Sequence, residues 1–146
     1  MKIAIASDHA GFELKEHLRQ YLSAKNHQVI DFGTYSIDST DYPDYAFPAS
    51  EAVAKGNVEL GILVCGTGTG MSITANKVQG VRAASCTSIE MAELARSHNN
   101  ANVLAVGSRL ISKQTAEEIV QKFIETDFEG GRHSRRVEKI HTLTRG

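Results

Sequence analysis

The sequence predicts an α/β fold, a Rossmann-like three-layer α/β/α domain with a five-stranded parallel sheet and a C-terminal helical tail. Short β-branched runs alternate with longer segments of helical period, which is the pattern of repeated strand-helix units. The run Leu60–Cys65 is wholly apolar around a single glycine. Such a run indicates a strand buried on both faces, as expected at the centre of a parallel sheet.

The expected strands are the β-branched or apolar runs Lys2–Ser7, Val29–Phe32, Leu60–Cys65, Val81–Cys86 and Val103–Val106. The helices that follow them are expected at Gly11–Lys25, from Pro43 to about Lys55, from near Gly70, from about Ser88 to His98, and over a stretch that includes Ala116–Ile124. Proline suits the first turn of the second helix. Apolar stripes on one face support the first helix at Leu14, Leu18, Tyr21 and Leu22, and the fifth at Ala116, Ile119, Val120, Phe123 and Ile124. A basic tail beyond Gly131 is expected to be helical.

Length and composition fit one domain over residues 1–146, with 41% hydrophobic and 23% charged residues. Sixteen basic and seventeen acidic side chains leave a formal net charge of −1. This balance argues against nucleic acid as a partner and favours a small molecule. Positive charge gathers only at Arg132, His133, Arg135 and Arg136. Such a run suits a compact anion.

Cys65 and Cys86 form neither a disulfide framework nor a CxxC motif, which implies a reducing compartment. The first apolar segment is too short for a signal peptide, and no apolar stretch approaches membrane-spanning length. We therefore expect a cytoplasmic protein with no membrane partner.

Ligands of open parallel sheets bind outside the carboxyl ends of the strands. Asp8 and His9 follow the first expected strand there, and Arg109 follows the fifth. The third expected strand ends in the loop Gly66-Thr67-Gly68-Thr69-Gly70. Its backbone N–H groups could bind a phosphate or an enediolate oxygen, or the loop could be only a tight turn. It matches neither the dinucleotide fingerprint nor the Walker A loop.

Several of these residues allow two interpretations. Cys65 lies beside the glycine loop, where a thiol can ionise more readily, or it is a small buried side chain. His98 follows Met91, Leu94 and Ala95 on the expected apolar face of its helix, which alone favours a core histidine, and Asn99 could simply end that helix. Arg132 and Arg136 share one helical face, suited either to a phosphate or to solvent. Cys86 is assigned to the core.

Six motifs in order resemble the B-type ribose-5-phosphate isomerase family, which is related to the subunits of galactose-6-phosphate isomerase. They are Ser7–Phe12, Thr40–Pro43, Cys65–Gly70, His98–Asn99, Gly107–Arg109 and Glu129–His133. The resemblance implies an isomerase that needs no cofactor and no metal. It implies that Cys65 moves a proton between C2 and C1 of the sugar, that the loop Gly66–Gly70 holds the enediolate, and that His98 opens the ring.

The resemblance implies substrate-binding roles for the remaining site residues. Asp8 and His9 would contact the sugar or its phosphate, Asn99 would orient the substrate, Tyr42 would line the ring-opening end, and Arg109, Arg132 and Arg136 would hold the phosphate. Some family members have serine in place of this cysteine and a carboxylate in the following helix. Here Met71-Ser72-Ile73-Thr74 offers no acid, so Cys65 is the only base that fits the pattern.

Topology predicts how these residues meet. The third strand ends with Cys65 at the carboxyl edge of the sheet. The fourth helix starts at that same edge and runs back toward the opposite edge, rising about 1.5 Å per residue. His98, at the end of this helix, is therefore expected near the opposite edge, far from Cys65. We therefore expect a homodimer with two shared sites, and a higher oligomer is left open. Two other functions also remain open: an isomerase of a six-carbon sugar phosphate, such as allose or galactose 6-phosphate, and a non-catalytic sugar-phosphate-binding module.

Overall fold

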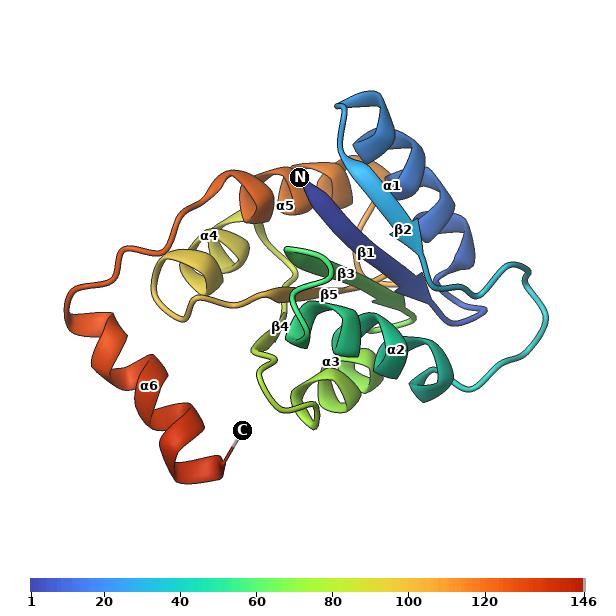
Figure 1. The fold of residues 1–146 in the computed structure, drawn as a ribbon. Helices are drawn as coiled ribbons and strands as arrows, with labels where there is room; N and C mark the ends of the chain where they lie inside the picture. Colours follow the sequence, from blue (N-terminus) through green and yellow to red (C-terminus); the bar gives the residue numbers. More distant parts are fainter. Residues whose placement is uncertain (146) are drawn as a thin grey trace.

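A computed structural model describes residues 1–145 and contains one sheet of five parallel strands in the order β2-β1-β3-β5-β4 (Figure 1). The strands are β1 (Lys2–Ser7), β2 (Gln28–Asp31), β3 (Leu60–Cys65), β4 (Ala83–Ser85) and β5 (Val103–Gly107). All six residues of β3 are buried, and β3 pairs with β1 on one side and β5 on the other. Its apolar run therefore predicted its central position correctly.

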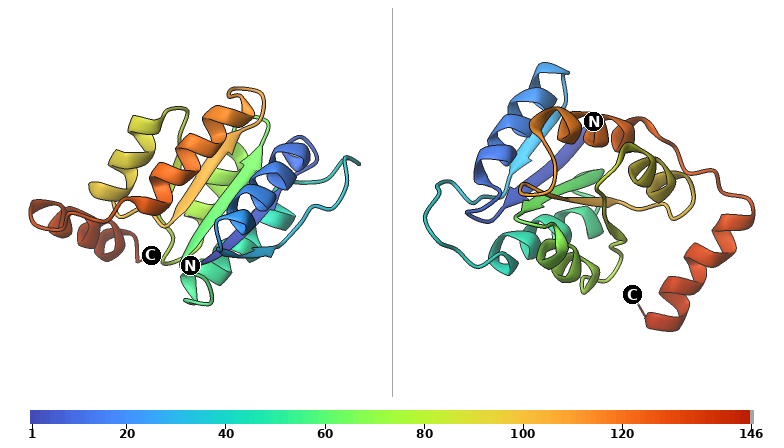
Figure 2. Two further views of the ribbon diagram at one scale, coloured as in Figure 1. Left: turned by 90° about the horizontal axis from the view of Figure 1, so that it is seen from above. Right: turned by 180° about the vertical axis from the view of Figure 1, so that it is seen from behind.

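Helices cover both faces of the sheet (Figure 2). They are α1 (Phe12–Ala24), α2 (Pro43–Ala54), α3 (Thr69–Asn76), α4 (Ile89–Ser97), α5 (Lys113–Glu125) and α6 (Arg132–Thr144). One hydrophobic cluster packs α1, α4 and α5 on one face, and a second packs α2 and α3 on the other. This arrangement confirms the three-layer α/β/α architecture with a helical C-terminal tail.

The fourth strand is shorter than the sequence predicted. The N–H of Val81 donates to the carbonyl of Val78, and the N–H of Arg82 donates to Oδ1 of Asn102. The strand itself runs only over Ala83–Ser85, with Ala83 in register with Val103. Cys86 lies just beyond the strand and is 1% exposed, so its assignment to the core is confirmed although its place in the strand was wrong.

Helix α6 lies beyond α4, outside the two helical layers (Figures 1 and 2), and its C-terminal end contacts the α3–β4 connection through hydrogen bonds of His141 with Arg82 and of the Arg145 carbonyl with Gln79. Only His133 and Val137 of this helix are buried, whereas Ile140 and Leu143 are 44% and 79% exposed. An amphipathic helix normally buries its apolar stripe against another element. Most of the apolar surface of α6 has no such partner in the described chain.

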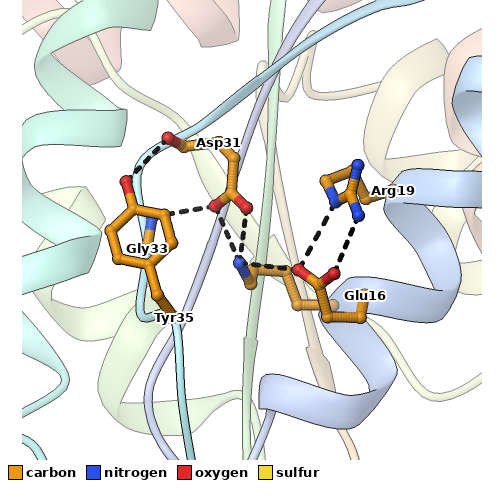
Figure 3. Close-up of polar contacts among 6 residues, drawn as sticks. Glu16, Arg19, Asp31, Gly33 and Tyr35 are labelled. Carbon is orange, nitrogen blue, oxygen red and sulfur yellow. Dashed lines mark hydrogen bonds and ion pairs between the residues drawn. The ribbon is translucent and has the colours of Figure 1, made fainter.

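A fully buried lysine of α1, Lys15, holds the segment that leaves β2, and Figure 3 labels its partners Asp31 and Glu16. Lys15 Nζ donates to both carboxylate oxygens of Asp31, at 2.8 and 2.7 Å, and lies 3.2 Å from Glu16 Oε1. Asp31 Oδ1 also accepts the N–H of Gly33 at 2.8 Å, and the Gly33 carbonyl accepts the N–H of Ser7 at 2.6 Å. The ion pair therefore ties the start of the β2–α2 connection to the end of β1.

Within residues 1–145, no helix combines the length and the apolar character needed to cross a membrane.

We predict that Asp31→Asn lowers the free energy of unfolding by about 2–4 kcal/mol, because it leaves the Lys15 ammonium buried with a weaker partner. Urea unfolding measures the loss. The matched control is Glu51→Gln, which breaks the exposed Lys55–Glu51 pair at 3.8 Å and should change stability by less than about 1 kcal/mol. Equal losses in the two variants would contradict the anchoring role of the buried pair.

Candidate active site

The ends of three neighbouring strands bring the predicted catalytic loop and its neighbours to one edge of the sheet. Ser7 of β1 is in register with Val64, and Cys65 of β3 is in register with Gly107 of β5. The segments that follow these strands therefore lie side by side. They carry Asp8, His9, the glycine loop and Arg109, as the topology of a parallel sheet predicted.

Cys65 ends β3 and is only 5% exposed. The N–H of Gly68 donates to its Sγ at 3.2 Å, and the N–H of Ser108 donates to its carbonyl at 2.8 Å. The sulfur thus has a fixed backbone donor and lies one residue before the glycine loop. Both contacts fix Cys65 at the start of the loop that joins β3 to α3.

Glycines are required in this loop by close backbone approaches. Gly68 has a φ of +83°, the left-handed region that other residues rarely adopt, and it caps α3. A Cβ on Gly107 would lie 2.6 Å from the carbonyl carbon of Thr67. The β3–α3 and β5–α5 connections therefore pack backbone against backbone, which fixes the loop.

The loop donors are partly engaged within the chain. Besides the Gly68 N–H on sulfur, the N–H of Thr69 donates to Thr67 Oγ1 at 3.3 Å. Arg109 lies over the loop, because a Cβ on Gly66 would be 3.1 Å from its Nη1. A guanidinium placed there adds positive charge beside Gly66 and the start of the loop.

Asp8 and His9 have different structural roles at the end of β1. Asp8 is 8% exposed, and its Oδ1 accepts the N–H of Gly11 at 3.0 Å at the start of α1. His9 Nδ1 accepts the N–H of Thr40 at 3.1 Å, while Thr40 Oγ1 accepts the main-chain N–H of His9 at 3.1 Å. Since Nδ1 is an acceptor, neutral His9 carries its proton on Nε2 and can donate it to a ligand.

Tyr42 closes the same edge from the other side. A Cβ on Gly70 would lie 2.6 Å from the Tyr42 ring, so the ring rests directly on the start of α3. Tyr42 is 41% exposed and can still face a ligand. The connection between β2 and α2 is therefore held at Asp31, at Thr40 and at Tyr42.

His98 follows α4 and is the cap at its C-terminal end. The face of α4 that carries it is exposed: Met91 is 45% and Leu94 is 41% exposed. The predicted apolar face is buried at Ala95, but the prediction was wrong for Met91 and Leu94, because the helix packs through Ala92 and Ala95. His98 is half-buried, and its ring stacks on that of His133, with centroids 4.3 Å apart and planes inclined by 13°.

Arg132 and Arg136 are both exposed on α6, four residues apart. Asn99 is also exposed and follows His98 directly. The C-terminal end of α4 leads into β5, whose first residue Val103 starts at the opposite edge from Cys65. Within one chain the predicted residues therefore fall into two groups, one around Cys65 and one around His98.

The sequence reasoning missed three neighbours of the predicted residues. Thr40 binds His9, and His133 and Glu129 lie against His98. The motif that contains Thr40 and the basic run that contains His133 were visible, but neither contact follows from spacing along the chain.

The other thiol, Cys86, is unsuited to acid-base work, because burial raises its pKa to about 11.

Comparison with known proteins agrees with this architecture. A sequence model described as Ribose/Galactose Isomerase matches residues 3–140. Ribose-5-phosphate isomerase B of Escherichia coli is 49% identical over 142 residues, which cover 97% of this chain and 95% of that protein. The structure of Clostridium thermocellum ribose-5-phosphate isomerase B has a TM-score of 0.98 at 47% identity, covering 99% of this chain and 98% of the other.

A second solved structure is that of Mycoplasma genitalium ribose-5-phosphate isomerase B with bound ribulose-5-phosphate. It has a TM-score of 0.95 at 45% identity, and the comparison covers 99% of this chain and 96% of the other. The match thus extends over both groups of site residues and over the C-terminal helix. The chain therefore belongs to the ribose/galactose isomerase family of enzymes.

Proposed function

We propose that this chain interconverts ribose 5-phosphate and ribulose 5-phosphate through a cis-enediolate, as a cytoplasmic enzyme of the pentose phosphate pathway. The observation that carries the proposal is Cys65, held by the Gly68 N–H at the convergence of three strand ends. The names of the similar isomerases and the ribulose-5-phosphate bound to one of them support the choice of substrate.

Cys65 acts as the base. Its thiolate takes the proton from C2 of the open-chain aldose, and the electron pair of that C–H bond forms the enediolate double bond. The proton of the C2 hydroxyl moves to O1, and the resulting thiol returns its proton to C1, so the aldehyde becomes a hydroxymethyl group and C2 becomes the ketone. Backbone N–H groups of the Gly66–Gly70 loop stabilise the negative oxygen that exists only during this step.

His98 opens the furanose ring by moving a proton between the ring oxygen and the anomeric hydroxyl. Arg132, Arg136 and Arg109 hold the phosphate through charge-assisted hydrogen bonds. Asp8, His9, Tyr42 and Asn99 contact and orient the sugar. These contacts fix the reacting carbons over Cys65, which is the main contribution that binding makes to proton transfer.

The site is completed by a second copy of the chain. Cys65 lies at one edge of the sheet, and His98 follows a helix that returns toward the other. A two-fold axis that places the His98 group of one copy against the Cys65 loop of the other forms two identical sites. The unpartnered apolar surface of α6 supports this arrangement, because a second copy would cover it.

An isomerase of a six-carbon sugar phosphate is the second function to consider, because the matching family description includes galactose. The same base and the same loop would serve it, and only the distance to the phosphate would differ. Parallel assays with ribose 5-phosphate, allose 6-phosphate and galactose 6-phosphate separate the two. A higher kcat/KM with a six-carbon substrate would replace the proposed substrate.

Cys65→Ala should lower kcat at least about a hundredfold and leave substrate affinity and stability nearly unchanged, because only the base is lost. Steady-state kinetics and ligand binding measure the two effects. The matched control is Cys86→Ala, which should alter stability modestly and turnover little. Near-normal turnover of Cys65→Ala would exclude Cys65 as the base. If the unaltered protein binds the sugar phosphate but does not turn it over, the chain is a non-catalytic binding module instead.

Arg132→Ala and Arg136→Ala should each raise KM for the phosphorylated sugar at least about tenfold, since each removes charge-assisted bonds to the phosphate. The comparison is with unphosphorylated ribose, whose weak binding should not change. Arg145→Ala, at the far end of α6, is the control of equal charge. Equal loss of affinity for both sugars would contradict phosphate binding by Arg132 and Arg136.

Mixing inactive Cys65→Ala and His98→Ala proteins under conditions of subunit exchange should restore activity. Each heterodimer of a shared-site enzyme contains one site with both native residues, so an equimolar mixture should regain about a quarter of the normal turnover. Exchange is verified by mass spectrometry of the native dimer. If exchange is complete and activity stays absent, both residues act within one chain.

A further inference from the structure

Three possible metal ligands meet where α6 begins. They are His98 at the end of α4, Glu129 before α6 and His133 in its first turn. One ligand atom from each residue lies within 4.8 Å of the other two. The Glu129 N–H donates to the Ser97 carbonyl at 3.0 Å. This backbone hydrogen bond holds Glu129 close to His98, which directly follows Ser97.

The pairing within this cluster is incomplete. His133 is 8% exposed, and its Nε2 has no hydrogen-bond partner within the described chain and almost no contact with solvent. Glu129 Oε2 lies 3.4 Å from this nitrogen without the geometry of a hydrogen bond. A buried imidazole nitrogen normally has a hydrogen-bond or metal partner, because leaving it unpaired costs its full desolvation penalty.

We propose that His98, Glu129 and His133 form a binding site for a divalent transition-metal ion, best suited to Zn²⁺, and that the bound ion inhibits the isomerase. Two imidazole nitrogens and one carboxylate form a ligand set that zinc prefers, whereas Mg²⁺ and Ca²⁺ prefer oxygen ligands alone. The carboxylate offsets one of the two positive charges of the ion. The fourth position stays open for water or another oxygen ligand.

The geometry needs only a local adjustment. Zinc holds nitrogen and oxygen ligands at about 2.0–2.2 Å, so the three atoms must draw closer than their present separations. His98 is half-buried at a helix end, and the Glu129 side chain is 58% exposed. Both side chains turn toward the buried Nε2 of His133 when the ion binds. His98 leaves its stack on the His133 ring in doing so, because a metal ion lies in the plane of each imidazole that binds it.

Inhibition rests on the proposed ring-opening role of His98. A metal bond uses the imidazole lone pair that would otherwise accept a proton, so the metal-bound residue cannot perform that step. Binding itself does not depend on this role. The binding and inhibition measurements therefore test the two proposals separately.

Binding is tested with Co²⁺ as a spectroscopic substitute for Zn²⁺, in intact protein carrying Cys65→Ser. This background removes the thiolate that would compete for the ion. We expect the visible absorption of four-coordinate cobalt at one ion per chain, displaced by Zn²⁺. In the same background, Glu129→Gln should weaken metal affinity at least about tenfold and His133→Ala at least about a hundredfold, because each removes a ligand.

Two controls define the result. His141→Ala and His17→Ala remove histidines that lie elsewhere, on Arg82 and on Glu117, and should leave metal affinity unchanged. With Cys65 present, Glu129→Gln should keep its basal isomerase activity and lose at least about tenfold of its sensitivity to Zn²⁺. Unchanged metal affinity in both ligand variants, or equal Zn²⁺ inhibition with and without Glu129, would overturn the proposal.

Discussion

The parallel direction of all five strands is the constraint on which the arrangement of the site depends. Every strand delivers its following residues to one edge, and every helix must then return over a face of the sheet before the next strand starts. Cys65 therefore meets Asp8 and Arg109 through neighbouring strand ends. The same rule carries His98 away from them, because it ends a returning helix.

Close backbone approaches give the Cys65 edge its rigidity. A Cβ on Gly11 would lie 2.4 Å from the Val64 carbonyl oxygen, so the turn after β1 packs directly on β3. The β2–α2 connection is held differently, through the buried ammonium of Lys15 and the carboxylate of Asp31. This ion pair lies under the segment that later supplies Thr40 to His9 and the Tyr42 ring to Gly70. Backbone packing and one buried charge pair thus determine a single arrangement of the edge.

The sequence allowed the strands, the three-layer architecture and the convergence of the strand-end residues to be predicted, because each depends on periodicity and direction alone. It did not predict contacts between side chains far apart in the chain. Lys15 interrupts the apolar stripe of α1, and most lysine side chains are exposed to solvent, yet Lys15 is fully buried. Met91 and Leu94 show the opposite error, because they were expected to be buried and are exposed. Apolar character alone does not say whether a helix face packs against its own chain or against another.

Helix α6 connects the second group of site residues into one unit. Its first turn is held by the stack of His133 on His98 and by the backbone bond from Glu129 to Ser97. Arg132 therefore keeps a defined position relative to His98, so the proposed phosphate-binding and ring-opening groups come from one chain as a rigid set. The proposed base lies at the other edge and, in the proposed shared site, belongs to the other chain. In that arrangement the distance between the reacting carbons and the phosphate is set by how two copies dock. Selection between five-carbon and six-carbon substrates would then belong to the interface rather than to either fold.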